Sequence, residues 1–226
     1  MPRPKVFGPQ ALIPWAVVSN ANRAARNWQS LKTKDPEAQA SNLKPRASHY
    51  NGCVDFKIRQ SRREDFDTLW RIDNECFPPG ISYSRLELAV YMRRPRSFTL
   101  LAEAAATDNK KSSAKGSQVA DSPVGVVGFI VAEANRRGTG HIITIDVLPT
   151  ARRFGIGSTL LSTAEEHLRA APCHAVELET AVDNLAALAF YKRHSYDLIN
   201  TIPGYYSNGV DALVLRKVLI PGSNPS

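Results

Sequence analysis

A glycine-bearing turn with two adjacent arginines is the part of this chain best suited to chemistry. An apolar run over 143–148 predicts a strand, and an amphipathic helix follows the turn at once. Gly155 and Gly157 leave the backbone N–H groups at the start of that helix uncovered. Arg152 and Arg153 add positive charge beside them. Bare amides, the positive end of a helix dipole and two guanidinium groups favour a pyrophosphate, so the sequence predicts a site for a phosphate-bearing cofactor.

The hydrophobic pattern predicts the elements that hold this turn in place. Alternating or continuous apolar runs predict strands at 54–59, 97–104, 124–134, 141–148, 174–180, 196–202 and 210–219. Helices are expected from an N-cap at Ser61 to a break at 77–80, from Ser82 or Ser84 to about Arg94, after Gly155, and over 184–193. This order of elements predicts a mixed α/β sheet in a single domain.

Positive charge is concentrated at the N-terminal end of the chain. The 226 residues have a formal net charge of +8, of which residues 1–52 carry +6. That segment is rich in Pro, Asn, Ser, Ala and Lys, and it is expected to be a basic, largely disordered extension. A folded domain is expected over 53–219, with a polar insertion at 105–121 and a short tail at 220–226. Because this domain is nearly neutral and has no basic stripe, we expect it to bind no nucleic acid.

Several kinds of site are disfavoured by composition and spacing. Three widely spaced cysteines form no C-x-x-C pair, which is typical of reduced thiols. The five histidines show no metal-binding spacing, so no metal is expected. No apolar run approaches the ~20 residues that a membrane span needs, so no membrane partner is expected. We expect a cytoplasmic protein, with organellar targeting by the basic extension as the alternative.

Residues 152–157, Arg-Arg-Phe-Gly-Ile-Gly, match the pattern Gln/Arg-x-x-Gly-x-Gly/Ala. Together with the preceding Ile-Asp-Val-Leu-Pro at 145–149 and the segment 178–191, this motif resembles the GNAT superfamily of acetyl-CoA-dependent N-acetyltransferases. Within the superfamily, the chain looks most similar to the ribosomal-protein alanine N-alpha-acetyltransferases. The resemblance covers roughly 53–219. It implies the GNAT fold, a mixed and mostly antiparallel central sheet of about seven strands flanked by about four helices.

The resemblance implies that acetyl-CoA is the cosubstrate and that no metal takes part. Backbone N–H groups near 145–147 are expected to pair with the pantetheine arm and to polarise the thioester carbonyl. The amides around 153–157 are expected to hold the pyrophosphate. The implied cofactor-binding residues are Ile145, Asp146, Val147, Arg152, Arg153, Phe154, Gly155, Ile156, Gly157, Ser158, Asn184 and Tyr191.

Two residues carry the catalytic roles that the resemblance implies. Glu179 is expected to act, directly or through water, as general base toward the substrate ammonium; alternatively it is an ordinary solvent-facing strand acid. Tyr191 is expected to protonate the departing CoA thiolate; alternatively it packs in the core beside Phe190. Asn184 is an adequate helix N-cap in either case.

The acceptor is expected to enter between two loops, at 77–82 and 202–209. Phe77 and Gly80 in the first loop, with Tyr205 and Tyr206 in the second, are the expected substrate-binding residues. One departure from the family lies nearby, where Ser195 stands in place of the usual glycine. Serine adopts the left-handed C-cap conformation less readily than glycine, so the geometry near Tyr191 is expected to differ.

We therefore expect an enzyme that transfers the acetyl group of acetyl-CoA to a primary amine, in the first place the N-terminal α-amine of a protein. A small-molecule amine acetyltransferase acting on a polyamine, amino sugar or amino acid is the alternative enzyme. A non-catalytic acyl-CoA-binding module is the third possible function. The expected partners are an acceptor protein N-terminus or a small amine, and the chain is expected to be a monomer or weak dimer.

Overall fold

The computed structural model describes residues 28, 55–105 and 125–220. The expectations for the extension at 1–52 and the tail at 220–226 lie outside the described residues, apart from Trp28 and Ile220. The insertion at 105–121 is likewise described only at Ala105. Trp28 is buried, with 3% of its surface exposed, and it belongs to the larger core cluster.

A seven-stranded sheet forms the centre of the described part of the chain, in the order β1-β2-β3-β4-β5-β7-β6. The strands are β1 (Phe56–Gln60), β2 (Ser97–Ala104), β3 (Gly125–Ala134), β4 (Thr139–Val147), β5 (Ala175–Ala181), β6 (Asp197–Ile202) and β7 (Ala212–Val218). Only β4 and β5 run parallel, and every other neighbouring pair is antiparallel. The predicted mixed, mostly antiparallel sheet is therefore confirmed.

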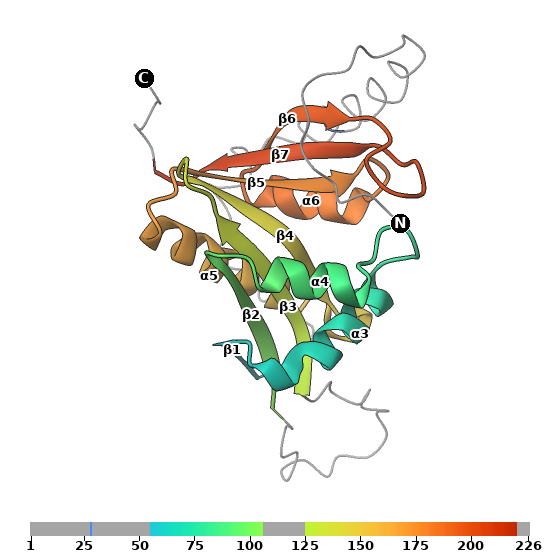
Figure 1. The fold of residues 1–226 in the computed structure, drawn as a ribbon, viewed down its shortest axis with the longest axis vertical. Coiled ribbons are helices and arrows are strands. Elements are labelled where there is room, and N and C mark those ends of the chain that lie inside the picture. The colour runs from blue at the N-terminus through green and yellow to red at the C-terminus, as the bar shows by residue number, and fades with distance from the viewer. Residues whose placement is uncertain (1–27, 29–54, 106–124, 221–226) are drawn as a thin grey trace, which may run out of the picture.

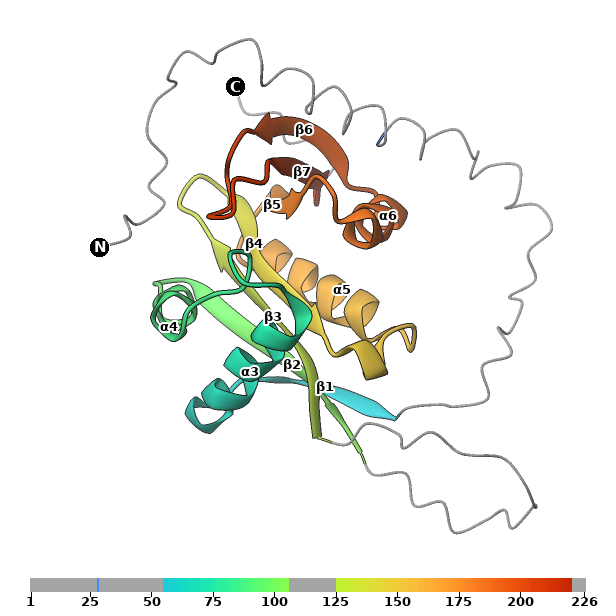
Figure 2. The ribbon, with the colours of Figure 1, turned by 90° about the vertical axis from the view of Figure 1, so that its right-hand side faces the viewer.

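Helices cover both faces of the sheet (Figures 1 and 2). The described α-helices are α3 (Phe66–Cys76), α4 (Arg85–Met92), α5 (Ile156–Ala170) and α6 (Leu185–Arg193), and two short 3-10 turns, η3 (Arg63–Asp65) and η4 (Pro149–Ala151), precede α3 and α5. Helices α3 and α4 lie on one face of β2, β3 and β4, and α5 lies on the other (Figure 2). Helix α6 lies along the β5–β7 part of the sheet (Figure 1).

Each face of the sheet has its own core. The predicted stripe of α5, which is Ile156, Leu160, Leu161, Ala164 and Leu168, is buried in the larger cluster. A smaller cluster joins Leu69 and Ile72 of α3 and Leu88 of α4 to the opposite face of β2 and β3. Burial of these apolar side chains fixes both helix layers against one sheet.

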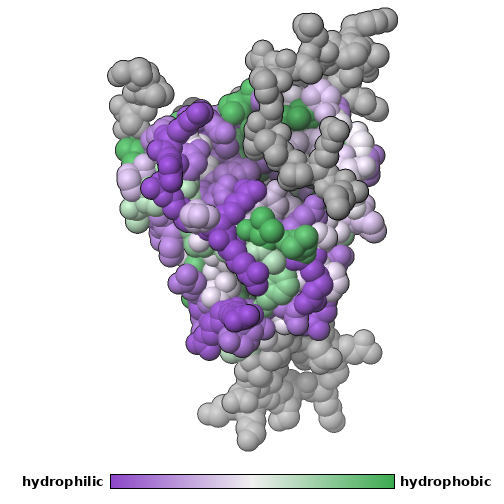
Figure 3. Space-filling model, in the orientation of Figure 1, coloured by the Kyte–Doolittle hydropathy of each residue, from purple (hydrophilic) through white to green (hydrophobic). Residues whose placement is uncertain are grey.

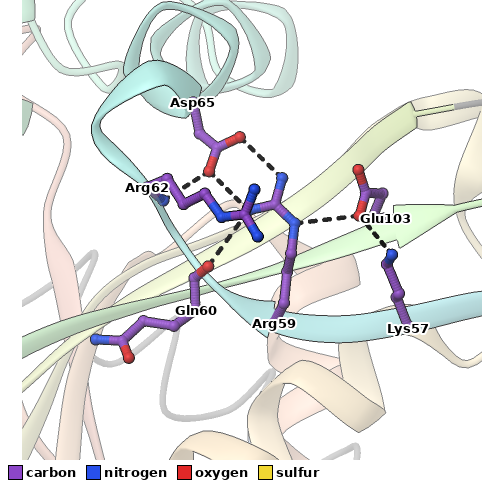
Figure 4. Close-up of polar contacts among 6 residues, drawn as sticks. All are labelled: Lys57, Arg59, Gln60, Arg62, Asp65 and Glu103. Carbon is purple, nitrogen blue, oxygen red and sulfur yellow. Dashed lines mark hydrogen bonds and ion pairs between the residues drawn. The ribbon is translucent and has the colours of Figure 1, made fainter.

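The first helix begins differently from the prediction. We expected Ser61 to cap it, but the carboxylate of Asp65 accepts the N–H of Arg62 at 2.7 Å, and η3 leads into α3. Asp65 is held there by a bidentate pair with the guanidinium of Arg59 on β1, at 2.8 and 2.9 Å (Figure 4). Arg59 also contacts Glu103 of β2 at 3.1 Å, so one arginine fastens the edge strand to the start of the helix.

The second helix begins as expected at Ser84, which forms a capping box with Glu87. It ends at Met92 rather than near Arg94, because the chain turns there before Pro95 and the start of β2. Two apolar side chains of α4, Leu86 and Val90, are 74% and 50% exposed. Figure 3 shows the face over α4 as mostly hydrophilic with a small apolar area. Among the helices of the described residues, none is long and apolar enough to cross a membrane.

Candidate active site

Strands β4 and β5 separate part way along the sheet. Their parallel pairing runs only from Thr139 opposite Ala175 to Ile142 opposite Leu178. Beyond that point, the described ladder continues from β4 to β3 and from β5 to β7, so residues 143–147 and 179–181 face each other without pairing. The resulting wedge opens in the middle of the sheet, where backbone groups are free to bind an extended ligand.

Two amides of β4 point into this wedge. The N–H of Leu148 donates to the carbonyl of Val127 on β3. Because successive N–H groups of a strand point to opposite edges, the amides of Ile145 and Val147 face away from β3, toward β5. The amide of Asp146 faces β3, in register with Phe129. Of the three residues expected to offer amides, Ile145 and Val147 are therefore the donors, and Asp146 contributes only its side chain.

The predicted pyrophosphate turn has the expected geometry. Gly155 is the N-cap of α5 with φ +84°, and no side chain caps the helix, so the first-turn amides are left for a ligand. Arg153 also has a positive φ, +69°. An open hollow of about 410 Å³ lies at this turn and is lined by Pro149, Thr150, Arg152, Arg153 and Phe154. The uncapped, basic helix end thus fits the pyrophosphate of acetyl-CoA.

The two arginines of the turn differ in their contacts. The Nε of Arg152 donates to the carbonyl of Val147 at 2.9 Å, which ties the turn to the end of β4. Arg153 is exposed at the hollow. One donor of Arg152 is therefore already used in a hydrogen bond to the backbone, which makes Arg153 the arginine better placed to bind a phosphate.

The other expected cofactor residues lie between α5 and α6. Ile156 is buried in the core, and Gly157 lies against the ring of Phe190, which a Cβ would meet at 3.6 Å. Ser158 Oγ lies 3.0 Å from Nε2 of His194 at the end of α6. The side chain of Asn184 accepts the N–H of Ala187 at 3.1 Å, which confirms its N-cap position.

Tyr191 is buried on α6, where its ring lies 5.4 Å from that of Tyr196. Burial raises the pKa of Tyr191 well above its ordinary value, and the nearby Asp146 carboxyl and Tyr206 phenol raise it further. A phenol with a raised pKa keeps its proton, as a proton donor to a departing thiolate must. The influence of Asp146 places Tyr191 near the end of β4.

Glu179 is paired with His141, a residue that the sequence reasoning missed. The two side chains come from adjacent parallel strands, and Nε2 of His141 lies 2.7 Å from Oε2 of Glu179. Glu133, which Arg94 contacts at 3.1 Å, lies 3.9 Å from the other ring nitrogen. Burial alone would lower the pKa of His141, but the neighbouring carboxylates of Glu133 and Glu179 outweigh it and raise the pKa to about 9. Glu179 is thus hydrogen-bonded to a histidine of the neighbouring strand.

The position of His141 on β4 could have been used to predict its contact with Glu179. Period-two alternation places it on the same face of the sheet as Glu179, but only if the two strands are adjacent and in register. The neighbouring acid, Glu177, forms a separate ion pair with Arg216 at 3.3 Å.

The two loops expected to admit the acceptor touch each other. Ser207 Oγ donates to the carbonyl of Gly80 at 2.9 Å, and Gly80 has φ +91°. The rings of Tyr205 and Tyr206 meet edge to face at 5.1 Å. Both phenols have raised pKa values, chiefly through burial and with a contribution from Glu179. Phe77 is the C-cap residue of α3, at the start of the first loop.

Tyr83 and Asp73 form a second set that sequence reasoning missed. The N–H of Tyr83 donates to Oδ2 of Asp73 at 2.7 Å, and the phenol donates to the carbonyl of Ile143 at 3.2 Å. Tyr83 therefore joins the first loop to the edge of β4, at the point where the wedge begins. In the described residues, no group of three or more His, Cys, Asp or Glu side chains could hold a metal ion.

The sequence of this chain matches a known protein family. The profile of the acetyltransferase (GNAT) family matches residues 66–196. The chain is 31% identical over 161 residues to an uncharacterized N-acetyltransferase of Methanocaldococcus jannaschii, with 71% of this chain and 90% of that protein covered. It is 25% identical over 177 residues to an N-alpha-acetyltransferase of Saccharolobus solfataricus, with 73% and 94% covered.

Solved structures share the fold. Ard1 from Thermoplasma volcanium superposes with a TM-score of 0.61 at 23% identity, covering 74% of this chain and 99% of that one. The ribosomal-protein-S18-alanine N-acetyltransferase of Escherichia coli gives 0.58 at 18% identity, covering 76% and 99%. A NatC complex bound to Gag peptide and CoA gives 0.57 at 24% identity, covering 74% and 100%. The wedge, the uncapped helix and the family match together make this chain a member of the GNAT family, an acetyl-CoA-dependent N-acetyltransferase.

Proposed function

We propose that this chain acetylates the N-terminal α-amine of a protein. The observation that carries the proposal is the hydrogen bond from Ser207 to Gly80, which joins the two loops. The second loop also contains Tyr205 and Tyr206, whose phenols are influenced by Glu179. Tyr205 and Tyr206 offer flat apolar rings with hydroxyl tips to an extended peptide. The naming of relatives such as that of Saccharolobus solfataricus as N-alpha-acetyltransferases supports the same substrate class.

The charge of the two loops favours a peptide over a polyamine. Residues 77–83 and 202–210 contain no Asp or Glu. A polyamine carries several positive charges, and each needs a carboxylate or an aromatic face to replace its lost hydration. A peptide N-terminus brings only one charge to the site, and its backbone can pair with loop amides and hydroxyls.

The Glu179–His141 pair provides the proton acceptor. The α-amine arrives mostly as an ammonium ion and must lose a proton before its nitrogen can attack the carbonyl carbon. The carboxylate of Glu179, held at 2.7 Å by Nε2 of His141, is the group that takes the ammonium proton. On the other side of the ring, the carboxylate of Glu133 lies 3.9 Å from Nδ1 of His141, and Arg94 contacts that carboxylate at 3.1 Å.

Acetyl-CoA supplies the acetyl group as a thioester. The amides of Ile145 and Val147 at the open edge of β4 can donate to the thioester carbonyl and to the pantetheine arm. Tyr191 keeps its proton and donates it to the sulfur as the carbon–sulfur bond breaks and the carbon–nitrogen bond forms. The nitrogen loses its second proton as it becomes an amide, and that proton restores the phenol of Tyr191. The products are an acetylated amine and the free thiol of CoA.

Turnover measured by release of the CoA thiol tests the proposal. The panel would contain tetrapeptides with free N-termini, the same peptides with blocked N-termini, and small amines that include spermidine, glucosamine and free amino acids. We expect turnover with free peptides alone. A double variant with Tyr205 and Tyr206 replaced by alanine should lose kcat/KM for peptides and keep its affinity for acetyl-CoA. Turnover confined to small amines would contradict the proposal, and tight acetyl-CoA binding without turnover would favour a non-catalytic module.

A further inference from the structure

A row of charged side chains crosses one face of the sheet on three neighbouring strands. Glu133 of β3 lies directly opposite His141 of β4, and Glu177 of β5 lies opposite His141 on the other side. Side chains that lie opposite each other in neighbouring strands share a face of the sheet, and so do residues two apart along one strand. Glu133, His141, Glu177 and Glu179 therefore project from the same face, with the imidazole between the carboxylates of β3 and β5.

The two carboxylates of β5 have different partners. Glu177 is the nearer one to His141 in register, but it pairs at 3.3 Å with Arg216 of β7, which lies directly opposite it. The imidazole of His141 contacts Glu179 instead, with Nε2 at 2.7 Å from Oε2. The ion pair of Glu177 with Arg216 therefore leaves Glu179 as the carboxylate of β5 that His141 contacts.

The carboxylate of Glu133 is fixed on the other side of the imidazole. Its Oε1 lies 3.9 Å from Nδ1 of His141, which is too long for a hydrogen bond and short enough for an ion pair. The guanidinium of Arg94, two residues after the end of α4, donates to both oxygens of Glu133, at 3.1 and 3.4 Å. The same guanidinium lies over the ring of Tyr91, 4.1 Å from its centroid. Arg94 thus joins the end of α4 to Glu133, and Glu133 faces His141.

Carboxylates on both sides of the ring favour the charged form of His141. Burial would lower the pKa of His141, but Glu133 and Glu179 outweigh it and raise the pKa to about 9. A charged imidazole has an N–H on each ring nitrogen, so Nε2 can donate to Glu179 while Nδ1 faces Glu133. A neutral imidazole would present a lone pair to one of the two carboxylates. The two acids together therefore favour one orientation and one charge state of the ring.

We propose that Glu133, fixed by Arg94, is a positioning residue for acetyl transfer, which holds the imidazole of His141 with Nε2 toward Glu179. Because His141 in turn fixes one oxygen of Glu179, the other oxygen of that carboxylate stays in place to accept the ammonium proton of the acceptor. This inference rests on the proposed function, in which Glu179 is the proton acceptor. Glu133 itself contacts no reacting atom, and it acts through His141.

A double-mutant cycle tests whether Glu133 acts through His141. Glu133→Gln should lower kcat by about threefold to tenfold and leave the KM for acetyl-CoA nearly unchanged, because only the orientation of the proton acceptor is disturbed. In the His141→Gln background, Glu133→Gln should have no further effect on kcat, since the ring through which it acts is gone. Glu103→Gln is the matched control, because Glu103 is also a strand carboxylate that pairs with an arginine, Arg59, at 3.1 Å. It should leave kcat unchanged in both backgrounds.

Long-range ¹H–¹⁵N NMR spectra of the histidine rings give a readout that does not depend on turnover. The signals of His141 are assigned by their loss in His141→Gln. In the wild type we expect both ring nitrogens of His141 to carry a proton at pH 7. In Glu133→Gln the ring should titrate at least about one pH unit lower, because one of its two neighbouring negative charges is removed. Glu103→Gln should titrate as the wild type does.

The outcomes separate this inference from the proposed function. If Glu133→Gln lowers kcat by the same factor with and without His141, or if His141 titrates alike in Glu133→Gln and the wild type, the inference is wrong. The cycle uses whichever amine the enzyme acetylates, so turnover of a small amine in place of peptides contradicts the proposed function, while the cycle still decides the role of Glu133. If no amine is acetylated, the inference fails together with the proton-accepting role of Glu179.

Discussion

The imidazole of His141 lies 2.7 Å from the carboxylate of Glu179, across the only parallel strand pair of the described sheet. His141 lies one residue before the last paired residue of β4, and Glu179 is the first residue of β5 beyond the pairing. The proposed proton acceptor is thereby fixed on two strands at the point where the wedge begins.

Replacing Glu179 by glutamine should lower kcat by about 10²- to 10⁴-fold, the usual contribution of general base catalysis. The matched control is Glu177→Gln, because that acid lies two residues away on the same face and pairs with Arg216. Steady-state kinetics with saturating acetyl-CoA measure both variants. If Glu179→Gln and Glu177→Gln have equal kcat values, Glu179 is not the general base.

The His141 pair should make stability depend on pH. The pKa of His141 is raised in the folded state to about 9 from the ordinary 6.5. Its contribution to the free energy of unfolding is therefore fully present below pH 6.5 and is lost as pH rises to 9, by at most about 3 kcal/mol. Denaturant unfolding of the wild type and His141→Gln between pH 6 and 9.5 measures the difference. Parallel pH curves for the two proteins would contradict the pairing.

Replacing Tyr191 by phenylalanine should lower kcat by about tenfold to 100-fold and leave the affinity for acetyl-CoA nearly unchanged, since only the proton donor is lost. Tyr196→Phe is the control, because it removes the same hydroxyl from a ring 5.4 Å away. That hydroxyl donates to the buried Glu165 at 3.1 Å, so its loss should reduce stability by about 1–3 kcal/mol and spare kcat. If Tyr191→Phe turns over as the wild type does, proton donation by this phenol is excluded.

Replacing Arg153 by glutamine should weaken acetyl-CoA binding by about threefold to tenfold, because an exposed arginine beside the uncapped end of α5 is lost. At high ionic strength the variant and the wild type should differ less in their affinity for acetyl-CoA, because salt screens exposed charges. Isothermal titration with acetyl-CoA at low and high ionic strength measures this. Arg136→Gln, in the exposed turn between β3 and β4, should bind as the wild type does.

Ser195 adopts the left-handed conformation that a glycine usually takes after a helix, with φ +63°, so the expected change in backbone geometry at this position is not seen. The family's glycine adopts this conformation without the steric cost that a Cβ brings. Ser195→Gly should therefore raise the free energy of unfolding by about 0.5–1 kcal/mol and leave kcat unchanged. Chemical denaturation measures the free energy of unfolding, and release of the CoA thiol measures kcat. A destabilised variant would show that the serine side chain makes a compensating contact.

Local pattern determined most of the secondary structure of this protein. The alternation at β1, the capping box of Ser84 and the apolar stripe of α5 depend on residues within a few positions of each other, so the printed sequence contains them in full. The pyrophosphate turn was predictable for the same reason, because a glycine, two arginines and a helix start occupy consecutive positions. The Ser61 cap was wrong because Asp65 accepts the N–H of Arg62 instead, and Arg59 of β1 holds the Asp65 carboxylate in place.

Tertiary structure decided which side chains meet at the site. His141 and Glu179 are 38 positions apart and come together only because β4 and β5 are adjacent and in register. Tyr83 and Ile143 are 60 positions apart, and the phenol of Tyr83 donates to the carbonyl of Ile143 only because the first loop packs against β4. A sequence fixes residue types and local spacing, but burial and the partners of a charge depend on which distant elements pack together, and these set the proton chemistry of the site.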